Sequence, residues 1–384
     1  MGDVLCLRGG KVLRSNSLQE QDLFIDRDII SDSSKKYTRA VDVTSCHVLP
    51  GIIDVHGDGF EHVLMPRAGV HMDKNHGLIE VDKQLISNGI TTAYHGVTVS
   101  YEPGQRSLAE ALDFVSALDL MRDRLAARHL LHLRAETFAF EHFEAIFERL
   151  KTQPSPLLAF NDHLTNLMEG GHMMKKLGKM TARSGLDEVS YKKLVNGLWA
   201  KRDLVDKYVA ELANLSRSLG IKMFAHDEIT IQQRQQHRDL GIFVSEFPMT
   251  EDVAQNAIDH CEHTVMGAPN LLRGKSHNGA ISARDMVRQK RCTIIASDYY
   301  YPAPLRSIYL MDQLGIMPLE QGWSLVSQNP AEASGLADLG QLEPGFLADI
   351  LVVEPRDEGP QLRYVFRNGQ LVYQAPSHNF FGLA

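Results

Sequence analysis

The sequence predicts an α/β protein in which a (β/α)8 TIM-like barrel carries a small composite β domain made from both ends of the chain. Three features predict it. Strands and helical segments alternate through the middle of the chain, short β segments occupy both ends, and polar residues recur where the central strands end. A length of 384 residues is sufficient for a large barrel with one accessory domain.

Both ends of the chain show the short, broken β segments of a small sheet domain. Near the N-terminus, apolar residues alternate or cluster between Gly, Asn and Ser breaks in residues 4–8, 11–13, 22–30 and 40–43. Near the C-terminus, residues 348–354 form a candidate strand and residues 362–373 a hairpin that turns at Asn368-Gly369. Neither end carries enough apolar area to be stable alone. We therefore expect residues 1–49 and 341–384 to pair into one composite β-sandwich domain.

The central segment, residues 50–340, alternates strands with helices. Its candidate strands end near the following residues: His56, Val97, Glu136, Asp162, His226, Phe247, Gly267 and Asp298. Helical periodicity fills the intervals, for example in residues 107–125 and 251–260. Eight strands with interposed helices predict a (β/α)8 barrel. A doubly wound sheet is the alternative, but no G-x-G-x-x-G turn follows any of these strands.

One connection of the predicted barrel, residues 164–220, is too long for a simple loop. Its first part is rich in glycine, methionine and basic residues, which include Lys175, Lys176, Lys179 and Arg183. Connections of this size are typical of lids or of added helices. We expect a lid that covers an anionic ligand, and a solvated helix face is the equal alternative.

The first central strand ends in two residue types that bind divalent metals. Pro50-Gly51 marks the start of the strand, and residues 52–55 suit a strand that is buried on both faces. Because alternate side chains of a strand point the same way, His56 and Asp58 are expected to project together from its end. An imidazole beside a carboxylate forms half of a divalent-metal site.

The same residue types follow apolar runs at the ends of other strands, namely Glu136, His163, His226 and Asp298. In a barrel the carboxyl ends of the strands share one rim, so these donors are expected to meet. Two divalent ions that share a carboxylate would explain so many ligands, and we expect Glu136 to lie between them. His56 and Asp58 would hold one ion, and His163 and His226 the other.

These ligands predict a hydrolytic centre. Water bound to a divalent ion has a pKa of about 7 and supplies hydroxide at neutral pH. Asp298 is then the group expected to accept the proton of this water and to pass it to the leaving group. One or two ions are expected, with zinc favoured over manganese and iron. Glu246 also ends a strand and is expected either to contact substrate or to hold the ring nitrogen of a ligand.

Composition argues against several other classes of function. The net charge is −8, from 40 basic and 48 acidic residues, so no overall positive field would recruit nucleic acid or a membrane surface. No apolar run approaches the roughly 18 residues of a bilayer span, and the first residues lack the pattern of a secretory signal. The four cysteines lie far apart without a C-x-x-C pair. A cytoplasmic protein with a small-molecule substrate is expected.

Several motifs together resemble the amidohydrolase superfamily. They are the opening Leu49-Pro-Gly-Ile-Ile-Asp-x-His56, the strand-end Asp298, Asn329-Pro-Ala331 and the closing Gly345-Phe-Leu-Ala-Asp-Ile350. The resemblance covers essentially the whole chain. It implies a metal-dependent hydrolase barrel with a composite β domain, in agreement with the pattern of elements, and it also admits a homo-oligomer.

Within this superfamily the chain is similar to the branch of α-D-ribose 1-methylphosphonate 5-triphosphate diphosphatases, which act in phosphonate breakdown. The similar stretches are His56-Gly-Asp58, Glu61, Met65-Pro-Arg-Ala-Gly-Val70, Val244-Ser-Glu-Phe-Pro248, residues 265–279 and Ser297-Asp-Tyr299. That branch hydrolyses a ribose 5-triphosphate to a 5-phosphate and diphosphate. The resemblance therefore implies a phosphorylated ribosyl phosphonate as substrate.

One loop has the chemistry to bind the phosphate groups of such a substrate. The loop Arg273-Gly-Lys-Ser-His277 follows a strand and combines cations, a hydroxyl, an imidazole and backbone N–H groups freed by glycine. We predict that Arg273, Lys275 and His277 bind the polyphosphate. Arg67 and Arg134 are predicted to add to this site.

Two stretches depart from the pattern of that branch. Leu-Thr-Asn follows His163, and three tyrosines, residues 299–301, follow Asp298. Both stretches are expected to line the substrate cavity, so a cyclic amide, an N-acyl compound or a deaminase-type C–N substrate is the alternative. A barrel that binds a ligand without catalysis is a third interpretation, against which the complete set of six strand-end ligands argues.

Overall fold

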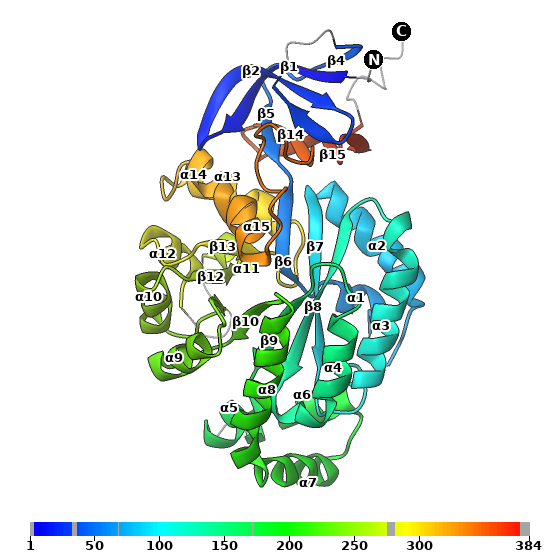
Figure 1. Ribbon diagram of the computed structural model, residues 1–384, viewed down its shortest axis with the longest axis vertical. Helices are drawn as coiled ribbons and strands as arrows, with labels where there is room; N and C mark the ends of the chain where they lie inside the picture. The colour runs from blue at the N-terminus through cyan, green and yellow to red at the C-terminus, as the bar shows by residue number, and fades with distance from the viewer. Residues whose placement is uncertain (1–3, 33–36, 68, 171–172, 275–280, 377–384) are drawn as a thin grey trace.

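The computed structural model describes residues 4–32, 37–67, 69–170, 173–274 and 281–376. One sheet of parallel strands is surrounded by helices, and a second sheet, built from both ends of the chain, lies at one end of the molecule (Figure 1). This arrangement confirms the predicted α/β class, with a nearly closed (β/α)8 barrel and a separate sheet. Among the helices of the described residues, none combines the length and the apolar character that crossing a bilayer requires.

The barrel sheet has eight parallel strands that neighbour one another in chain order. They are β6 (Ile52–Gly57), β7 (Ile90–Val99), β8 (Arg128–Glu136), β9 (Leu157–Asn161), β10 (Lys222–His226), β11 (Val244–Glu246), β12 (His263–Gly267) and β13 (Ile294–Ala296). The predicted strand ends lie within two residues of these bounds. Helices cover the outside of the wall and side chains fill its inside, so all ten residues of β7 are buried. Burial on both faces explains why these strands are apolar without alternation.

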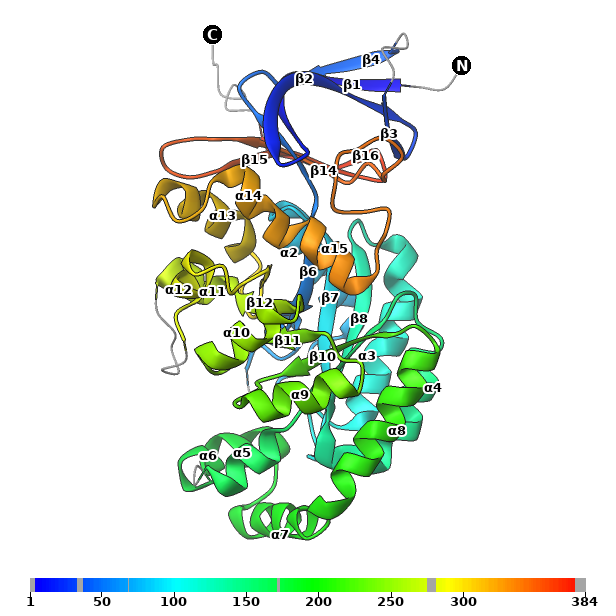
Figure 2. The same ribbon diagram turned by 60° about the vertical axis from the view of Figure 1, so that its left-hand side comes forward.

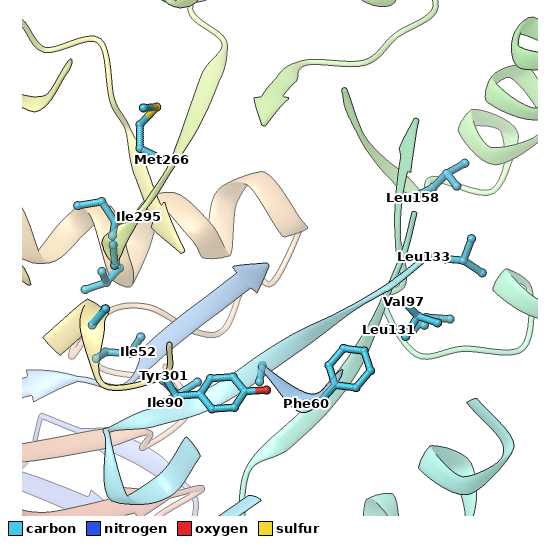
Figure 3. Packing of buried hydrophobic residues seen from close by; sticks show 14 of the residues in the cluster. Ile52, Phe60, Ile90, Val97, Leu131, Leu133, Leu158, Met266, Ile295 and Tyr301 are labelled. Atoms are coloured by element: carbon cyan, nitrogen blue, oxygen red, sulfur yellow. The ribbon is translucent and has the colours of Figure 1, made fainter. Parts of the chain in front are cut away.

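Neighbouring residues of β8 show the two sides of the barrel wall. Leu130 belongs to the apolar cluster that fills the barrel interior, whereas Leu131 packs in the layer between strands and helices (Figure 3). Because side chains alternate along a strand, the residues two, four and six positions after Leu130 also point into the barrel. These residues are His132, Arg134 and Glu136.

The first and last strands of the barrel meet at a seam rather than along a full ladder. A single isolated bridge pairs Gly57 with Asp298. The backbone N–H of Asp298 donates to the carbonyl of His56 at 2.9 Å, and the N–H of Asp58 donates to the carbonyl of Asp298 at 3.0 Å. The seam therefore places the backbone of Asp298 directly against those of His56 and Asp58.

Helices that connect the strands pack on the outside of the barrel (Figure 2). They are α1 (Phe60–Leu64), α2 (Lys74–Ser87), α3 (Leu108–Met121), α4 (Phe143–Leu150), α8 (Val205–Ser218), α9 (Ile231–Asp239), α10 (Glu251–Asp259), α11 (Ala268–Arg273), α12 (Ala283–Arg288), α13 (Ala303–Gln313) and α14 (Leu319–Gly322). The last helix, α15 (Gln328–Ser334), instead packs Ala331 and Ala333 against the apolar cluster of the barrel interior. Side chains cap the N-terminal ends of α2, α3, α9, α10 and α12. Ser107, for example, accepts a hydrogen bond from the N–H of Glu110 at the start of α3.

The second sheet joins the two ends of the chain. Its strands are β1 (Val4–Arg14), β2 (Ser17–Asp26), β3 (Ile29–Ser31), β4 (Arg39–Asp42), β5 (His47–Pro50), β14 (Ile350–Glu354), β15 (Gln361–Arg367) and β16 (Gln370–Gln374). β5 pairs in parallel with β1 and antiparallel with β14, and the β15–β16 hairpin turns at Asn368 and Gly369 with φ of 47° and 71°. These strands form one hydrogen-bonded sheet. The division of the chain into domains at residues 49/50 and 340/341 stays a prediction.

The long connection between β9 and β10 contains added helices. They are α5 (His163–Glu169), α6 (Met173–Ser184) and α7 (Glu188–Trp199), which precede α8. Because β6 starts directly after β5 of the terminal sheet, its carboxyl end points away from that sheet, and α5–α7 lie at this opposite end (Figures 1 and 2). The side chains of Lys175, Lys176 and Lys179 lie outside the described residues. A lid function for this segment stays a prediction.

Candidate metal centre and active site

A bulge at the end of β6 turns His56 into the barrel. Asp54 pairs with Ala93 and Gly57 with His95, so three steps along β6 match two steps along β7. One extra residue in a strand re-aims the side chains that follow it. Val55 belongs to the interior apolar cluster. The next residue, His56, faces the same interior and is 1% exposed.

His56 is held by a buried carboxylate on the opposite side of the barrel. Its Nδ1 lies 2.8 Å from Oε1 of Glu246 at the end of β11. Burial alone would raise the pKa of Glu246, but the charges of His56 and His132 hold it well below its ordinary value. Burial would lower the pKa of His56, and the Glu246 carboxylate raises it instead. The position of Glu246 suits the second of the two roles expected for it, the orientation of a ring nitrogen, and this role stays a prediction.

His226, at the end of β10, presents a nitrogen lone pair to the barrel interior. Its ring centre lies 5.5 Å from that of His56. Burial lowers the pKa of His226 and so favours the neutral ring. A guanidinium can only donate, and Nη2 of Arg134 lies 3.0 Å from Nε2 of His226, so this nitrogen is the acceptor. The proton is then on Nδ1, which faces Oδ2 of Asp227 at 3.2 Å.

A second group of donors lies beside His226. His163, at the start of α5, contacts the carboxylate of Glu136 through Nδ1 and lies 3.5 Å from Oδ2 of Asp227 through Nε2. The charge of Glu136 raises the pKa of His163 to about 9. Asp227 adopts a positive φ of 58°, which turns the chain at the strand end and lets this side chain contact both histidines.

Two further carboxylates complete the rim. Asp58 lies 4.0 Å from Nη1 of Arg134 through its Oδ2. Asp298 follows β13 with a φ of 55° and is fixed at the seam by the backbone hydrogen bonds to His56 and Asp58. Burial and the charge of Asp58 raise the pKa of Asp298 to about 7.

The donors fit a divalent ion by position. His56, His226 and Glu246 each offer an atom within 4.8 Å of the others, and so do His163, His226 and Asp227. A Cβ added to Gly96 would lie 3.6 Å from Nε2 of His56, so the glycine leaves space beside this nitrogen. Imidazole and carboxylate donors suit zinc, manganese and iron alike.

Buried polar atoms without partners support the same conclusion. Within the described part of the chain, several such atoms gather on the barrel-facing residues: Nε2 of His132, Nε of Arg134, Oε2 of Glu246, and both side-chain amide atoms of Asn161. Buried polar groups in proteins nearly always have a partner. Their concentration at one end of the barrel indicates that the site binds a polar ligand.

The structure brings most of the predicted site residues together. His56, Asp58, Glu136, His163, His226, Asp298 and Arg134 form one connected cluster. His226 lies between His56 and His163 and belongs to two possible donor groups. One group joins it to His163, as predicted, and the other joins it to His56 and Glu246.

Four predicted phosphate-binding residues are not placed in this cluster. Arg67 and Arg273 are exposed and, in the described residues, form no ion pair or hydrogen bond with it. Lys275 and His277 lie outside the described residues.

Sequence reasoning missed several residues of the site. Asp227 directly follows the strand-end His226 and could have been found by extending that search one residue beyond each strand. His132 precedes Glu136 by four positions and so shares its face of β8. Asp54, which accepts from the N–H of Ser297, and Arg106, which pairs with Glu61, gave no comparable signal, because these contacts join distant segments.

Comparisons with known proteins are consistent with this geometry. No family model matches the chain. The α-D-ribose 1-methylphosphonate 5-triphosphate diphosphatase of Escherichia coli (strain K12) is 27% identical over 354 residues, which cover 89% of this chain and 92% of that protein.

Three solved structures show the same fold. An amidohydrolase from an environmental sample of the Sargasso Sea has a TM-score of 0.67 at 13% identity and covers 97% of this chain and 93% of its own. A D-aminoacylase has a TM-score of 0.65 at 15% identity, with 97% of both chains covered. A prolidase bound to N-methylphosphonate-L-proline has a TM-score of 0.64 at 13% identity and covers 97% and 100%.

Proposed function

The chain belongs to the amidohydrolase superfamily, and from this membership we propose that it is a metal-dependent hydrolase of α-D-ribose 1-methylphosphonate 5-triphosphate or a close phosphorylated analogue. The products would be the 5-phosphate and diphosphate. The convergence of His56, His226 and Glu246 beside Asp298 carries the proposal, because it joins a divalent-ion site to a proton acceptor. The 27% identity to the diphosphatase supports the choice of substrate.

His56 and His226 are the residues that would hold the ion, His226 through the Nε2 lone pair that otherwise accepts from Arg134, and Glu246 fixes the ring of His56. A divalent ion supplies a coordinated water with a pKa of about 7. His163 and Asp227, together with His226, offer a second set of ligands, and the role of Glu136 as a carboxylate shared by two ions stays a prediction. Zinc is the expected metal, and the alternatives of manganese and iron rest on the same donor set.

Asp298 is the proposed proton acceptor. As water attacks phosphorus, the P–O bond to the departing diphosphate breaks, and the proton released by the water passes to this carboxylate and then to the leaving oxygen. The backbone hydrogen bonds across the seam hold Asp298 next to both His56 and Asp58. Arg134 supplies a buried positive charge within this acidic cluster.

Cleavage of a C–N bond is the second candidate. The similarity to a D-aminoacylase and to a Xaa-Pro dipeptidase favours it, because both names denote hydrolases of amide-type substrates. The tyrosines that follow Asp298 support it as well, since Tyr299 and Tyr300 are 36% and 49% exposed and could face a substrate. The products separate the candidates: diphosphate in one case, a carboxylate or ammonia in the other.

We also propose a cytoplasmic location. All four cysteines are free of disulfides, and three of them are buried. The predicted homo-oligomer stays a prediction.

The test combines metal content with product release. Metal would be measured by elemental analysis on wild type and on His56→Ala, and diphosphate release from a ribose 5-triphosphate on the same samples. His260→Ala is the matched control, because His260 is an exposed histidine that bonds the carbonyl of Asn256. We expect the first variant alone to lose metal and turnover. A metal-replete wild type without diphosphate release would leave the C–N candidate, and a protein that binds no metal would contradict both.

A further inference from the structure

We propose that Arg106 and Arg134 form the anion-binding wall of the site and that the phosphate chain of the substrate lies across their guanidinium groups. The inference rests on the proposed function in taking a polyphosphate as the substrate class. It sets aside the exposed Arg67 and Arg273 in favour of a buried arginine, Arg134, and a half-buried one, Arg106.

Arg134 is the cation at the centre of the cluster. Its residue is 4% exposed, and its Nη1 and Nη2 lie 4.0 Å from Asp58 Oδ2 and 3.0 Å from His226 Nε2. Its Nε has no hydrogen-bond partner in the described residues. Since a guanidinium has five N–H donors, most of its donor capacity is available to a ligand.

A second arginine, Arg106, is tied to the rim through Glu61, whose backbone N–H donates to the carbonyl of Asp58 at 2.9 Å. Arg106 lies in the loop after β7, at the carboxyl rim of the barrel, and its Nη2 pairs with Oε2 of Glu61 at 3.2 Å. Burial would lower the pKa of Arg106, but the charges of Glu61, Asp58 and Glu136 raise it. The charges of Asp58 and Glu136 thus act on both arginines. Nε of Arg106 is buried and has no partner among the residues described.

The loop that carries Arg106 is held in place from both sides. The N–H of Ser100 donates to the carbonyl of Arg106 at 2.7 Å, which closes the loop on itself. Glu102 is buried and accepts from Nε of Arg183 and from the hydroxyl of Tyr191, each at 2.7 Å. These contacts fix the position of Arg106 before any ligand arrives, which lowers the entropic cost of binding.

The chemistry of the two side chains suits phosphate. Arginine matches phosphate oxygens with two parallel N–H donors, and such charge-assisted contacts are stronger when they are desolvated. Exposed cations are weakened by water and salt. A simple structural ion pair would account for the contact of Arg106 with Glu61. It does not account for two arginines that each keep a buried Nε without a partner among the described residues while the charges of Asp58 and Glu136 act on both.

The test measures binding of inorganic triphosphate to the metal-loaded protein by calorimetry, together with steady-state diphosphate release. For Arg106→Gln we expect triphosphate affinity to fall and KM to rise by roughly tenfold or more, with metal content unchanged and kcat less affected. Arg106→Lys should recover part of the loss. Arg149→Gln is the matched control, because Arg149 is a similarly half-buried arginine that pairs with Asp119 on α3, away from the site.

Glu61→Gln gives a prediction of opposite sign. Removing this carboxylate takes away a competitor for Arg106 and a repulsive charge, so triphosphate affinity should rise. If the pair of Arg106 and Glu61 had a purely structural role, triphosphate affinity would not rise. If Arg106→Gln does not fold, Glu61→Gln still tests whether Arg106 binds the anion.

The outcomes separate this inference from the proposed function. Triphosphate binding that depends on Arg106 without diphosphate release would contradict the function and leave the anion site standing. Diphosphate release that is unchanged in Arg106→Gln would overturn the inference and leave the function standing. Absence of triphosphate binding by the metal-loaded wild type, or unchanged affinity in both Arg106→Gln and Glu61→Gln, would also overturn the inference.

Discussion

The carboxylate of Asp54 accepts two hydrogen bonds from Ser297, one from its backbone N–H at 2.9 Å and one from its hydroxyl. Asp54 lies in the first barrel strand, and Ser297 directly follows the last, so this pair bridges the seam. Both side chains are fully buried. The pair thereby fixes the residues that come next, His56 on one side and Asp298 on the other.

Asp54→Ala tests this bridge. The substitution leaves two buried donors of Ser297 unpaired, and each unpaired buried donor costs about 1–3 kcal/mol. We expect the free energy of unfolding in urea to fall by about 2–4 kcal/mol and kcat to fall as Asp298 loses its position. Ser297→Ala, which removes only the hydroxyl, should cost less. Equal stability of Asp54→Ala and wild type would contradict a bridging role.

Gly267→Ala tests the space around Asp298. A Cβ at position 267 would lie 3.2 Å from Oδ2 of Asp298, which is closer than most such contacts. The φ of Gly267 is −76°, so alanine is compatible with the backbone and the fold should tolerate it. We expect kcat to fall by roughly tenfold or more, because the added Cβ would displace the Asp298 carboxylate and slow proton transfer.

The control for this substitution is Gly197→Ala in α7, where nothing lies within 4 Å of the added Cβ. It should stabilise the protein by about 0.5–1 kcal/mol and leave turnover unchanged. If Gly267→Ala kept full activity, Asp298 would not need the space that the glycine leaves.

The sequence was sufficient to predict those site residues whose position depends on the strand alone. Glu136 and His226 each end an apolar run, and the alternation of a strand aims them at the barrel interior. His56 needed more, because the bulge between Asp54 and Gly57 appears only in the pairing of two strands.

Residues placed by tertiary contacts could not be predicted in this way. Arg106 reaches the acidic cluster because Glu102 fastens its loop to α6 and α7, helices that lie some eighty residues later in the chain. Arg273 shows the opposite case: its charge and its place after a strand favoured a phosphate contact, yet it is exposed at the end of α11. Charge and spacing do not report which cations are desolvated.

A buried histidine away from the site predicts acid sensitivity of the fold. Nε2 of His95 lies 2.8 Å from Nδ1 of His129, whose Nε2 lies 3.0 Å from Oδ1 of Asp82. Burial and the neighbouring His129 lower the pKa of His95 well below its ordinary value of 6.5. The folded state thus keeps this ring neutral, whereas the unfolded chain takes up a proton below pH 6.5.

The stability that His95 contributes rises with pH. Where the unfolded state binds more protons, stability rises with pH, so the contribution of His95 is complete above pH 6.5 and is lost as the pH falls. Between pH 7.5 and 5.5 we expect the free energy of unfolding to drop by about 1 kcal/mol on account of this residue. His95→Leu should show a shallower pH dependence, while substitution of the exposed His260 should not change it. Parallel curves for wild type and His95→Leu would contradict the assignment.

Glu102→Gln tests whether the added helices are anchored at the rim of the barrel. Glu102 is 2% exposed and binds Arg183 of α6 and Tyr191 of α7. Loss of a buried charged contact costs about 1.5–3 kcal/mol, so local opening of α6 and α7 should become roughly tenfold to a hundredfold more frequent. Trypsin should then cut at Lys192 or Lys193 correspondingly faster, with cleavage sites read by mass spectrometry. Glu188→Gln, which removes an exposed pair with Lys192, should leave the rate unchanged. Unaltered cleavage in Glu102→Gln would show that this anchor does not hold the helices to the barrel.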